Sequence, residues 1–157
     1  MIFVTVGTHT QGFDRLLKEI DRLVENKRIN ENIFVEISNS NYLPKNYNYT
    51  RLLPHKRYKE MIKKADVVIT HAGLGSVIDA LSNSKPLIVV PRLKKFEEHV
   101  DDHQLELGKI LEREKKAVVV YKIDSLDEAI RKVRKLKTQK NTEKKKLIET
   151  IESFLNK

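Results

Sequence analysis

The sequence contains no cysteine and no long hydrophobic run. Among 157 residues there is not one cysteine, which excludes a disulfide framework and thiolate catalysis. No segment approaches the ~20 consecutive apolar residues of a membrane-spanning helix. The first residues run directly into a strand-like segment without a basic leader, so we expect no signal peptide and a cytoplasmic protein. Internal repeats and low-complexity segments are also missing, and the length suits one domain.

The charge is strongly one-sided. The chain carries 31 lysines and arginines against 22 acidic residues, a formal net charge of +9. Such an excess suits an anionic partner, which can be a nucleic acid, an acidic membrane surface or a phosphorylated ligand. Much of the excess is lysine spread along predicted helices, and a solvated basic surface is the better explanation for most of it.

Short apolar strands alternate with amphipathic helices along the chain. This alternation predicts a single Rossmann-like α/β domain with a parallel sheet of about six strands flanked by helices. The predicted strands are residues 2–6, 33–37, 50–53, 67–70, 87–90 and 117–121. The predicted helices are residues 13–23, 58–65, 77–81, 105–111, 125–137 and 143–155, with Ser125 capping the fifth.

The last predicted helix follows a polar break at residues 138–142. We therefore divide the chain into a domain over residues 1–137 and a C-terminal amphipathic helix within 138–157, which packs on that domain or on a partner. Its apolar face would contain Leu147, Ile148, Ile151, Phe154 and Leu155.

A glycine-containing loop, HAGLGS at residues 71–76, follows the fourth predicted strand. Gly73 and Gly75 remove side chains where backbone N–H groups would approach a ligand. Ser76 is a good N-cap for the next helix. A helix amino end offers unpaired N–H donors and a positive dipole end, which suits phosphate. A plain strand-to-helix turn without a ligand explains the same residues about equally well.

A second polar loop follows the next strand and shifts the balance toward a binding site. It carries Glu97, Glu98 and His99 before residues 101–104 open another helix. Loops that follow adjacent parallel strands leave the same edge of the sheet, where open α/β sheets bind ligands.

Three segments in this order resemble a known family. They are VTVGT at residues 4–8, HAGLGS at 71–76 and EHVDDHQ at 98–104. Together they resemble the nucleotide-sugar-binding half of a GT-B glycosyltransferase. The likeness extends to the small catalytic subunit of the two-part N-acetylglucosaminyltransferase of dolichol-linked oligosaccharide assembly and to bacterial exopolysaccharide glycosyltransferase subunits. It also includes the carboxyl-terminal domain of the family 28 enzyme that makes peptidoglycan lipid II.

The resemblance implies roles for individual residues. Gly7 and Thr8 would face the diphosphate or the acceptor cleft, and Asp79 would bind the ribose hydroxyls. The residues implied around the diphosphate are His71, Gly73, Gly75 and Ser76, and those implied near the sugar are His99, Asp102, His103 and Gln104. The chain departs from the family pattern where Asp79 replaces the usual glutamate, where Ser84 replaces a usual glycine, and where residues 9–11 widen the first loop.

By the same resemblance, the chain would be the catalytic subunit of a UDP-sugar-dependent glycosyltransferase. It would transfer N-acetylglucosamine to a polyisoprenoid diphosphate-linked acceptor, together with a membrane-anchored subunit that binds the acceptor and holds the chain at the membrane. The alternative is that two copies of this chain form a homodimer and supply the cleft between donor and acceptor sites themselves. The rival functions are a non-catalytic nucleotide-sugar-binding module and a basic nucleic-acid-binding protein.

We expect no cofactor and no metal. Helix amides and a nearby cation can stabilise the diphosphate, with Arg92, Lys94 and Lys95 as candidates. His99 and His103 are four residues apart, with Asp102 between them, but a zinc site lacks a third ligand at suitable spacing.

Two other assignments stay open in the sequence. His99 is a candidate catalytic base by its titration range, whereas the resemblance places the base on the other domain. Tyr42, Tyr47 and Tyr49 with Lys45 suggest either a platform for stacking nucleic-acid bases or simple loop packing, and we expect no nucleic-acid partner.

Overall fold

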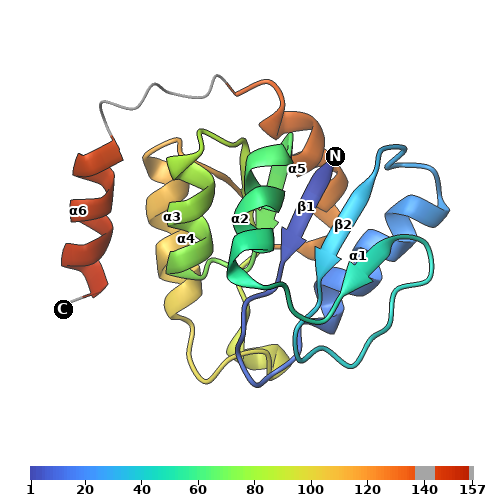
Figure 1. Ribbon diagram of the computed structural model, residues 1–157. Helices are drawn as coiled ribbons and strands as arrows, with labels where there is room; N and C mark the ends of the chain where they lie inside the picture. The colour runs from blue at the N-terminus through green and yellow to red at the C-terminus, as the bar shows by residue number, and fades with distance from the viewer. Residues whose placement is uncertain (137–143, 156–157) are drawn as a thin grey trace.

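A six-stranded, all-parallel sheet forms the centre of the molecule (Figure 1). The structure is a computed structural model that describes residues 1–136 and 144–155, apart from the side chains of residues 144, 145, 147, 152, 154 and 155. The strand order is β3-β2-β1-β4-β5-β6. The strands are β1 (Ile2–Thr5), β2 (Ile33–Glu36), β3 (Asn48–Thr50), β4 (Val67–Thr70), β5 (Leu87–Val89) and β6 (Val118–Val119). The predicted fold class is confirmed.

The central strands are buried along their whole length and mostly apolar because helices cover both faces of the sheet. Every residue of β1 and β4 is buried. In the register of the sheet, Ile2 lies opposite Ile33 and Val67. Thr5 lies opposite Glu36 and Thr70. The carboxyl ends of β1, β2 and β4 are therefore level, and the loops that follow them leave one edge of the sheet.

Helices form a layer on each face of the sheet (Figure 1). The helices α1 (Asp14–Glu25) and α5 (Leu126–Val133) pack with the strand residues Ile2 and Val4. On the other face, the buried cluster around Phe3 and Val68 includes residues of four helices. They are α2 (His55–Lys64), α3 (Leu74–Ser82), α4 (His103–Arg113) and α6 (Lys144–Leu155). The short 3₁₀ helices η1 (Lys94–Phe96) and η2 (Ile123–Ser125) complete the described elements.

Several predicted boundaries differ from those of the structure, most clearly at the third strand and the fifth helix. The third strand lies at Asn48–Thr50 and not at residues 50–53. Leu52 is 61% exposed, and the backbone N–H of Leu53 donates to the Glu36 carboxylate at 2.9 Å, so this apolar pair follows the strand. The fifth predicted helix ends at Val133 instead of 137. Ser125 is at its N-cap position as predicted, but its hydroxyl donates to the Lys122 carbonyl and makes no capping hydrogen bond.

The tyrosine-rich loop between β2 and β3 packs against α1. The Tyr42 hydroxyl donates to the Asp21 carboxylate at 2.6 Å, and the Tyr47 hydroxyl donates to the Leu17 carbonyl at 2.9 Å. Asp21 also accepts the backbone N–H groups of Lys45 and Asn46. Two of the three tyrosines are therefore anchored to α1, which matches the loop-packing alternative and not a stacking platform.

The C-terminal helix α6 contacts α3, and its Ile151 is buried in the same cluster as Phe3. The side chains of Leu147, Phe154 and Leu155, together with the predicted break at residues 138–142, lie outside the described residues. The division of the chain near residue 138 therefore stays a prediction. Among the helices that the structure describes, none has the length and apolar character to span a bilayer.

Candidate functional site

Loops that follow β1, β4 and β5 meet at the carboxyl edge of the sheet, the lower edge in Figure 1. The strand order reverses direction between β1 and β4, since β1 continues toward β2 and β4 continues toward β5. Open α/β sheets usually bind ligands at such a switch point, in the crevice outside the carboxyl ends of the strands, and we call this part of the sheet edge the crevice. The sequence-predicted site residues come from these three loops and from the helices α3 and α4.

His71 lies between two glycines at this crevice. A β-carbon at Gly7 would lie 2.3 Å from His71 Cε1, and one at Gly73 would lie 2.2 Å from its Nε2. Gly7 has a positive φ of 73°. The two glycines therefore leave the space that the imidazole occupies, and they bring the loops after β1 and β4 together. Thr8, beside Gly7, is exposed.

The His71 ring is neutral at physiological pH. Burial lowers the pKa of the His71 imidazole to about 3, and the positive charge of Arg92 acts in the same direction. Its Nδ1 lies 3.2 Å from the Thr70 hydroxyl. His71 therefore contributes no positive charge to the crevice.

The amino end of α3 borders the same crevice. Its N-cap residue is Gly73, and no side chain caps the helix. Because the first N–H groups of a helix have no partner within it, those at the start of α3 are available to an anion. A β-carbon at Gly75 would meet no atom within 4 Å, so the surface beside these amides is open.

The predicted capping role of Ser76 is wrong. Ser76 lies within the first turn of α3 and is buried. Its hydroxyl lies 2.5 Å from the Thr70 hydroxyl and donates to the Gly73 carbonyl at 2.9 Å. Ser76 thus fastens α3 to the end of β4. The left-handed residue of this loop is Ala72, with φ of 64°, and not Gly73 or Gly75.

Asp79 stands further along α3. Its carboxylate forms an ion pair with Lys59 of α2, and its side chain is 21% exposed. Asp79 is on the helix that directly follows the loop after β4. The residues predicted to contact the diphosphate and the ribose thus belong to one loop–helix segment. The pairing with Lys59 was not evident in the sequence, because the two residues meet only when α2 packs beside α3.

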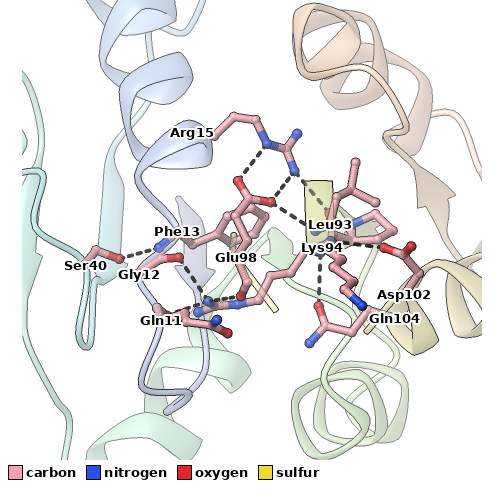
Figure 2. Close-up of polar contacts among 12 residues, drawn as sticks. Gln11, Gly12, Phe13, Arg15, Ser40, Leu93, Lys94, Glu98, Asp102 and Gln104 are labelled. Carbon is pink, nitrogen blue, oxygen red and sulfur yellow. Dashed lines mark hydrogen bonds and ion pairs between the residues drawn. The ribbon is translucent and has the colours of Figure 1, made fainter. Parts of the chain in front are cut away.

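Polar residues of the third loop hold its backbone. Asp102 accepts the N–H of Lys94 at 3.0 Å, and Gln104 accepts the N–H of Arg92 at 3.0 Å (Figure 2). The His103 side chain is 79% exposed. Of the predicted sugar contacts, Asp102 and Gln104 thus shape the loop, and His103 projects into solvent at the start of α4.

Two histidines from different loops stack at the crevice. The rings of His9 and His99 have centroids 4.6 Å apart and an angle of 35° between their planes. His99 Nδ1 also lies 3.1 Å from the Asp101 carboxylate. Sequence reasoning did not select His9 or Asp101. The first loop follows β1 and the third follows β5, and these strands lie on either side of β4 but far apart in the sequence.

Asp101, and not Asp102, connects the two histidines considered for zinc. His99 and His103 each place Nδ1 near an oxygen of Asp101, at 3.1 and 3.3 Å. His99 precedes α4, which begins at His103, so the two do not share a helix as the zinc alternative assumed. In the described parts of the chain, no group of three acidic or histidine side chains is placed to hold a metal ion.

Arg92 was predicted as a cation for the diphosphate, and its position contradicts this. Arg92 is fully buried and donates to four backbone carbonyls. Both terminal nitrogens of its guanidinium are therefore occupied inside the protein. Lys94 and Lys95 remain exposed on η1.

Comparisons with known proteins agree with this geometry. The model of the glycosyltransferase family 28 C-terminal domain matches residues 1–156. The human UDP-N-acetylglucosamine transferase subunit ALG13 is 36% identical over 122 residues, which cover 72% of this chain and 10% of that protein. The chain therefore spans about a tenth of this relative.

Solved glycosyltransferases share the fold. MurG of Acinetobacter baumannii superposes with a TM-score of 0.57 at 17% identity, covering 96% of this chain and 49% of that one. The glycosyltransferase SsfS6 of Streptomyces sp. SF2575, complexed with thymidine diphosphate, has a TM-score of 0.61 at 17% identity, covering 97% and 37%. The chain thus has the Rossmann-like fold of one domain of these glycosyltransferases. The chain belongs to the glycosyltransferase family 28 C-terminal domain family.

Proposed function

We propose that this chain is the donor-binding catalytic subunit of a UDP-sugar-dependent glycosyltransferase. The observation that carries the proposal is the uncapped, open amino end of α3 beside the crevice, in a chain of family 28. The donor is UDP-N-acetylglucosamine, since the human relative with 36% identity is named a UDP-N-acetylglucosamine transferase subunit. A structural neighbour complexed with thymidine diphosphate supports a nucleoside diphosphate as the bound group.

The diphosphate lies at the start of α3. Transfer forms a bond between the acceptor oxygen and the anomeric carbon and breaks the bond from that carbon to the β-phosphate oxygen. Negative charge then builds up on the departing UDP, and amide donors that already point at that position stabilise the transition state. Asp79, about one turn further along α3, accepts hydrogen bonds from the ribose hydroxyls, and the third loop contacts the sugar.

The acceptor hydroxyl must lose its proton to a base, and His99 is our candidate. Its Nδ1 lies 3.1 Å from the Asp101 carboxylate and 3.3 Å from the Asp101 backbone nitrogen. These two contacts with Asp101 fix the orientation of the ring. A group supplied by an acceptor-binding partner is the other candidate base.

The acceptor is a polyisoprenoid diphosphate-linked sugar, and a membrane-bound subunit supplies its site. The structural neighbours have chains about twice as long or longer than the part that matches this domain. A GT-B enzyme uses a cleft between two such halves, and this chain supplies the donor half. The exposed third loop, with Phe96 at 50% and Val100 at 63% exposure, borders the crevice and is our candidate contact for that subunit.

Calorimetry followed by a transfer assay tests the proposal. We expect UDP and UDP-N-acetylglucosamine to bind the purified chain, and GDP-mannose to bind more weakly. Transfer to a lipid diphosphate acceptor should require a membrane-bound, acceptor-binding subunit. No saturable binding of any UDP-sugar would refute the donor-site assignment. Binding without transfer in the presence of the partner would favour a non-catalytic module, and full transfer by the chain alone would refute the need for a partner.

A further inference from the structure

Arg92 joins two loops of the site through backbone carbonyls. One terminal nitrogen, Nη1, donates to the carbonyls of Gln11 at 2.6 Å, Gly12 at 3.1 Å and Glu98 at 3.1 Å. The other, Nη2, donates to the Val6 carbonyl at 2.6 Å. These hydrogen bonds place the guanidinium between the first loop and the third. Three acceptors belong to the chain segment after β1, and the fourth belongs to the loop that carries His99.

The Arg92 guanidinium is charged and has no exposure to solvent. Burial lowers its pKa to about 10, which the Glu98 carboxylate opposes, so the group stays protonated at neutral pH. Its carbon Cζ lies 5.0 Å from the centre of the Phe13 ring, which provides a cation–π contact. Burying a charge has a large desolvation cost, and apolar packing often gives equal stability without it. A buried arginine that binds only carbonyls therefore indicates that this arrangement fixes a geometry.

A second arginine holds the third loop from outside. Arg15 of α1 forms two parallel hydrogen bonds to the Glu98 carboxylate, at 2.8 and 2.9 Å, and donates to the Pro91 carbonyl at 3.1 Å. The same carboxylate accepts the N–H of Leu93 at 3.1 Å. Glu98 is 5% exposed. Arg15 thus holds the Glu98 side chain (Figure 2). Arg92 holds the Glu98 carbonyl.

His9 and His99 lie close in the sequence to Gln11 and Glu98, whose carbonyls bind Arg92. His9 lies two residues before Gln11 in the first loop, and His99 directly follows Glu98. We infer that Arg92 is a positioning residue that fixes the first loop against the third, so that His9 and His99 stack as one wall of the donor site. This inference rests on the proposed function for its link to the sugar.

The charges around the histidine pair favour the stacked arrangement. Burial lowers the pKa of His9, and the neighbouring His99 and Arg92 lower it further, whereas Asp101 raises it. His9 Nδ1 accepts the N–H of Gln11 at 3.3 Å, which requires a neutral ring nitrogen. A neutral His9 can approach both His99 and the Arg92 charge without repulsion.

Lysine cannot replace Arg92 in this role. The guanidinium is a planar group whose N–H donors point in several fixed directions, whereas an ammonium is a single point charge. Arg92→Lys keeps the charge but cannot reach carbonyls of both loops at once. The wild-type chain offers a matched control, Arg28→Lys, because Arg28 also binds through two nitrogens, to Asp127, away from the crevice.

The test compares wild type, Arg92→Lys and Arg28→Lys by proton NMR of the histidine rings and by calorimetry. In wild type and Arg28→Lys we expect a nuclear Overhauser effect between the His9 and His99 rings, which Arg92→Lys loses. We also expect Arg92→Lys to bind UDP-N-acetylglucosamine about tenfold more weakly, which corresponds to a loss of about 1.4 kcal/mol of binding free energy. UDP alone should change less than about threefold, since α3 and Asp79 are untouched.

Each outcome decides the inference. A folded Arg92→Lys that keeps the ring contact and both affinities overturns it. If wild type binds no UDP-sugar, the proposed function fails, and the ring contact alone still decides whether Arg92 positions the loops. If Arg92→Lys does not fold, Arg15→Lys replaces it: a weakened ring contact then supports the inference, and an unchanged one overturns it.

Discussion

Replacing Gly75 with alanine should stabilise the chain and weaken UDP binding at the same time. Gly75 is the second residue of α3, its φ lies outside the left-handed region, and a β-carbon there meets no atom within 4 Å. Glycine within a helix costs roughly 0.5–1 kcal/mol relative to alanine. Because Gly75 lies in the first turn, we expect a gain at the lower end of this range.

The same methyl group stands where the proposed phosphate approaches the α3 amides. Loss of one hydrogen bond to a charged group costs about 1.5–3 kcal/mol, which corresponds to a Kd for UDP that is roughly 10- to 150-fold weaker. Calorimetry with UDP measures the affinity, and urea denaturation measures the free energy of unfolding. Gly75→Val should weaken binding further.

Gly73→Ala provides the contrasting variant. Its β-carbon would lie 2.2 Å from the buried His71 ring, and overpacking of this kind costs about 1–3 kcal/mol of stability. We expect this variant to lose stability and binding together, whereas Gly75→Ala separates the two. A Gly75→Ala chain that binds UDP as tightly as wild type would refute the phosphate position.

Three further outcomes follow from the site. Asp79→Ala should weaken the binding of UDP by about tenfold but that of 2′,3′-dideoxy-UDP much less. Lys59→Met should weaken the binding of either nucleotide less strongly. Equal losses of affinity for both nucleotides in Asp79→Ala would contradict the ribose assignment. Gln104→Ala, which frees the Arg92 N–H, should change the preference among UDP-sugars more than UDP affinity, and unchanged KM and kcat across several donors would contradict this. His71 has a pKa of about 3 in the folded chain against 6.5 when unperturbed, so the unfolded state binds more protons between these values. The contribution of neutral His71 to stability is therefore complete above pH 6.5 and is lost as the pH falls toward 3. In urea denaturation, the free energy of unfolding of His71→Gln should fall less steeply between pH 6.5 and 3 than that of wild type.

The fold could be predicted from the sequence because local patterns and tertiary packing agree. The apolar runs at β1, β4 and β5 are bounded by polar or turn-forming residues, and the helical stripes between them allow only parallel pairing. The strand at Asn48–Thr50 was misplaced because the apolar Leu52 and Leu53 follow it. At the sheet edge, exposed side chains such as Tyr49 carry little of the pattern that identifies a buried strand.

The site was only partly predictable. Gly73, Gly75 and Asp79 lie on a single strand–loop–helix segment, so their spacing alone places them together. By contrast, His9 meets His99, and Arg92 meets Gln11 and Gly12, through contacts between residues about 80 or more apart in the chain. Nothing local distinguishes a buried arginine that binds carbonyls from an exposed one that binds phosphate, and this is why Arg92 was first assigned to the ligand.

The most direct test of the account is a titration of the ¹⁵N-labelled chain with UDP-N-acetylglucosamine, followed by backbone NMR. We predict saturable shifts of the amides of Gly7, Gly73, Leu74, Gly75 and Ser76, with smaller shifts across residues 99–104. Gly75→Val should abolish these shifts while leaving the rest of the spectrum unchanged. The absence of saturable shifts would contradict the account, as would shifts confined to the polar cleft at Asn32, Asn46 and Asn48 beside the amino ends of β2 and β3.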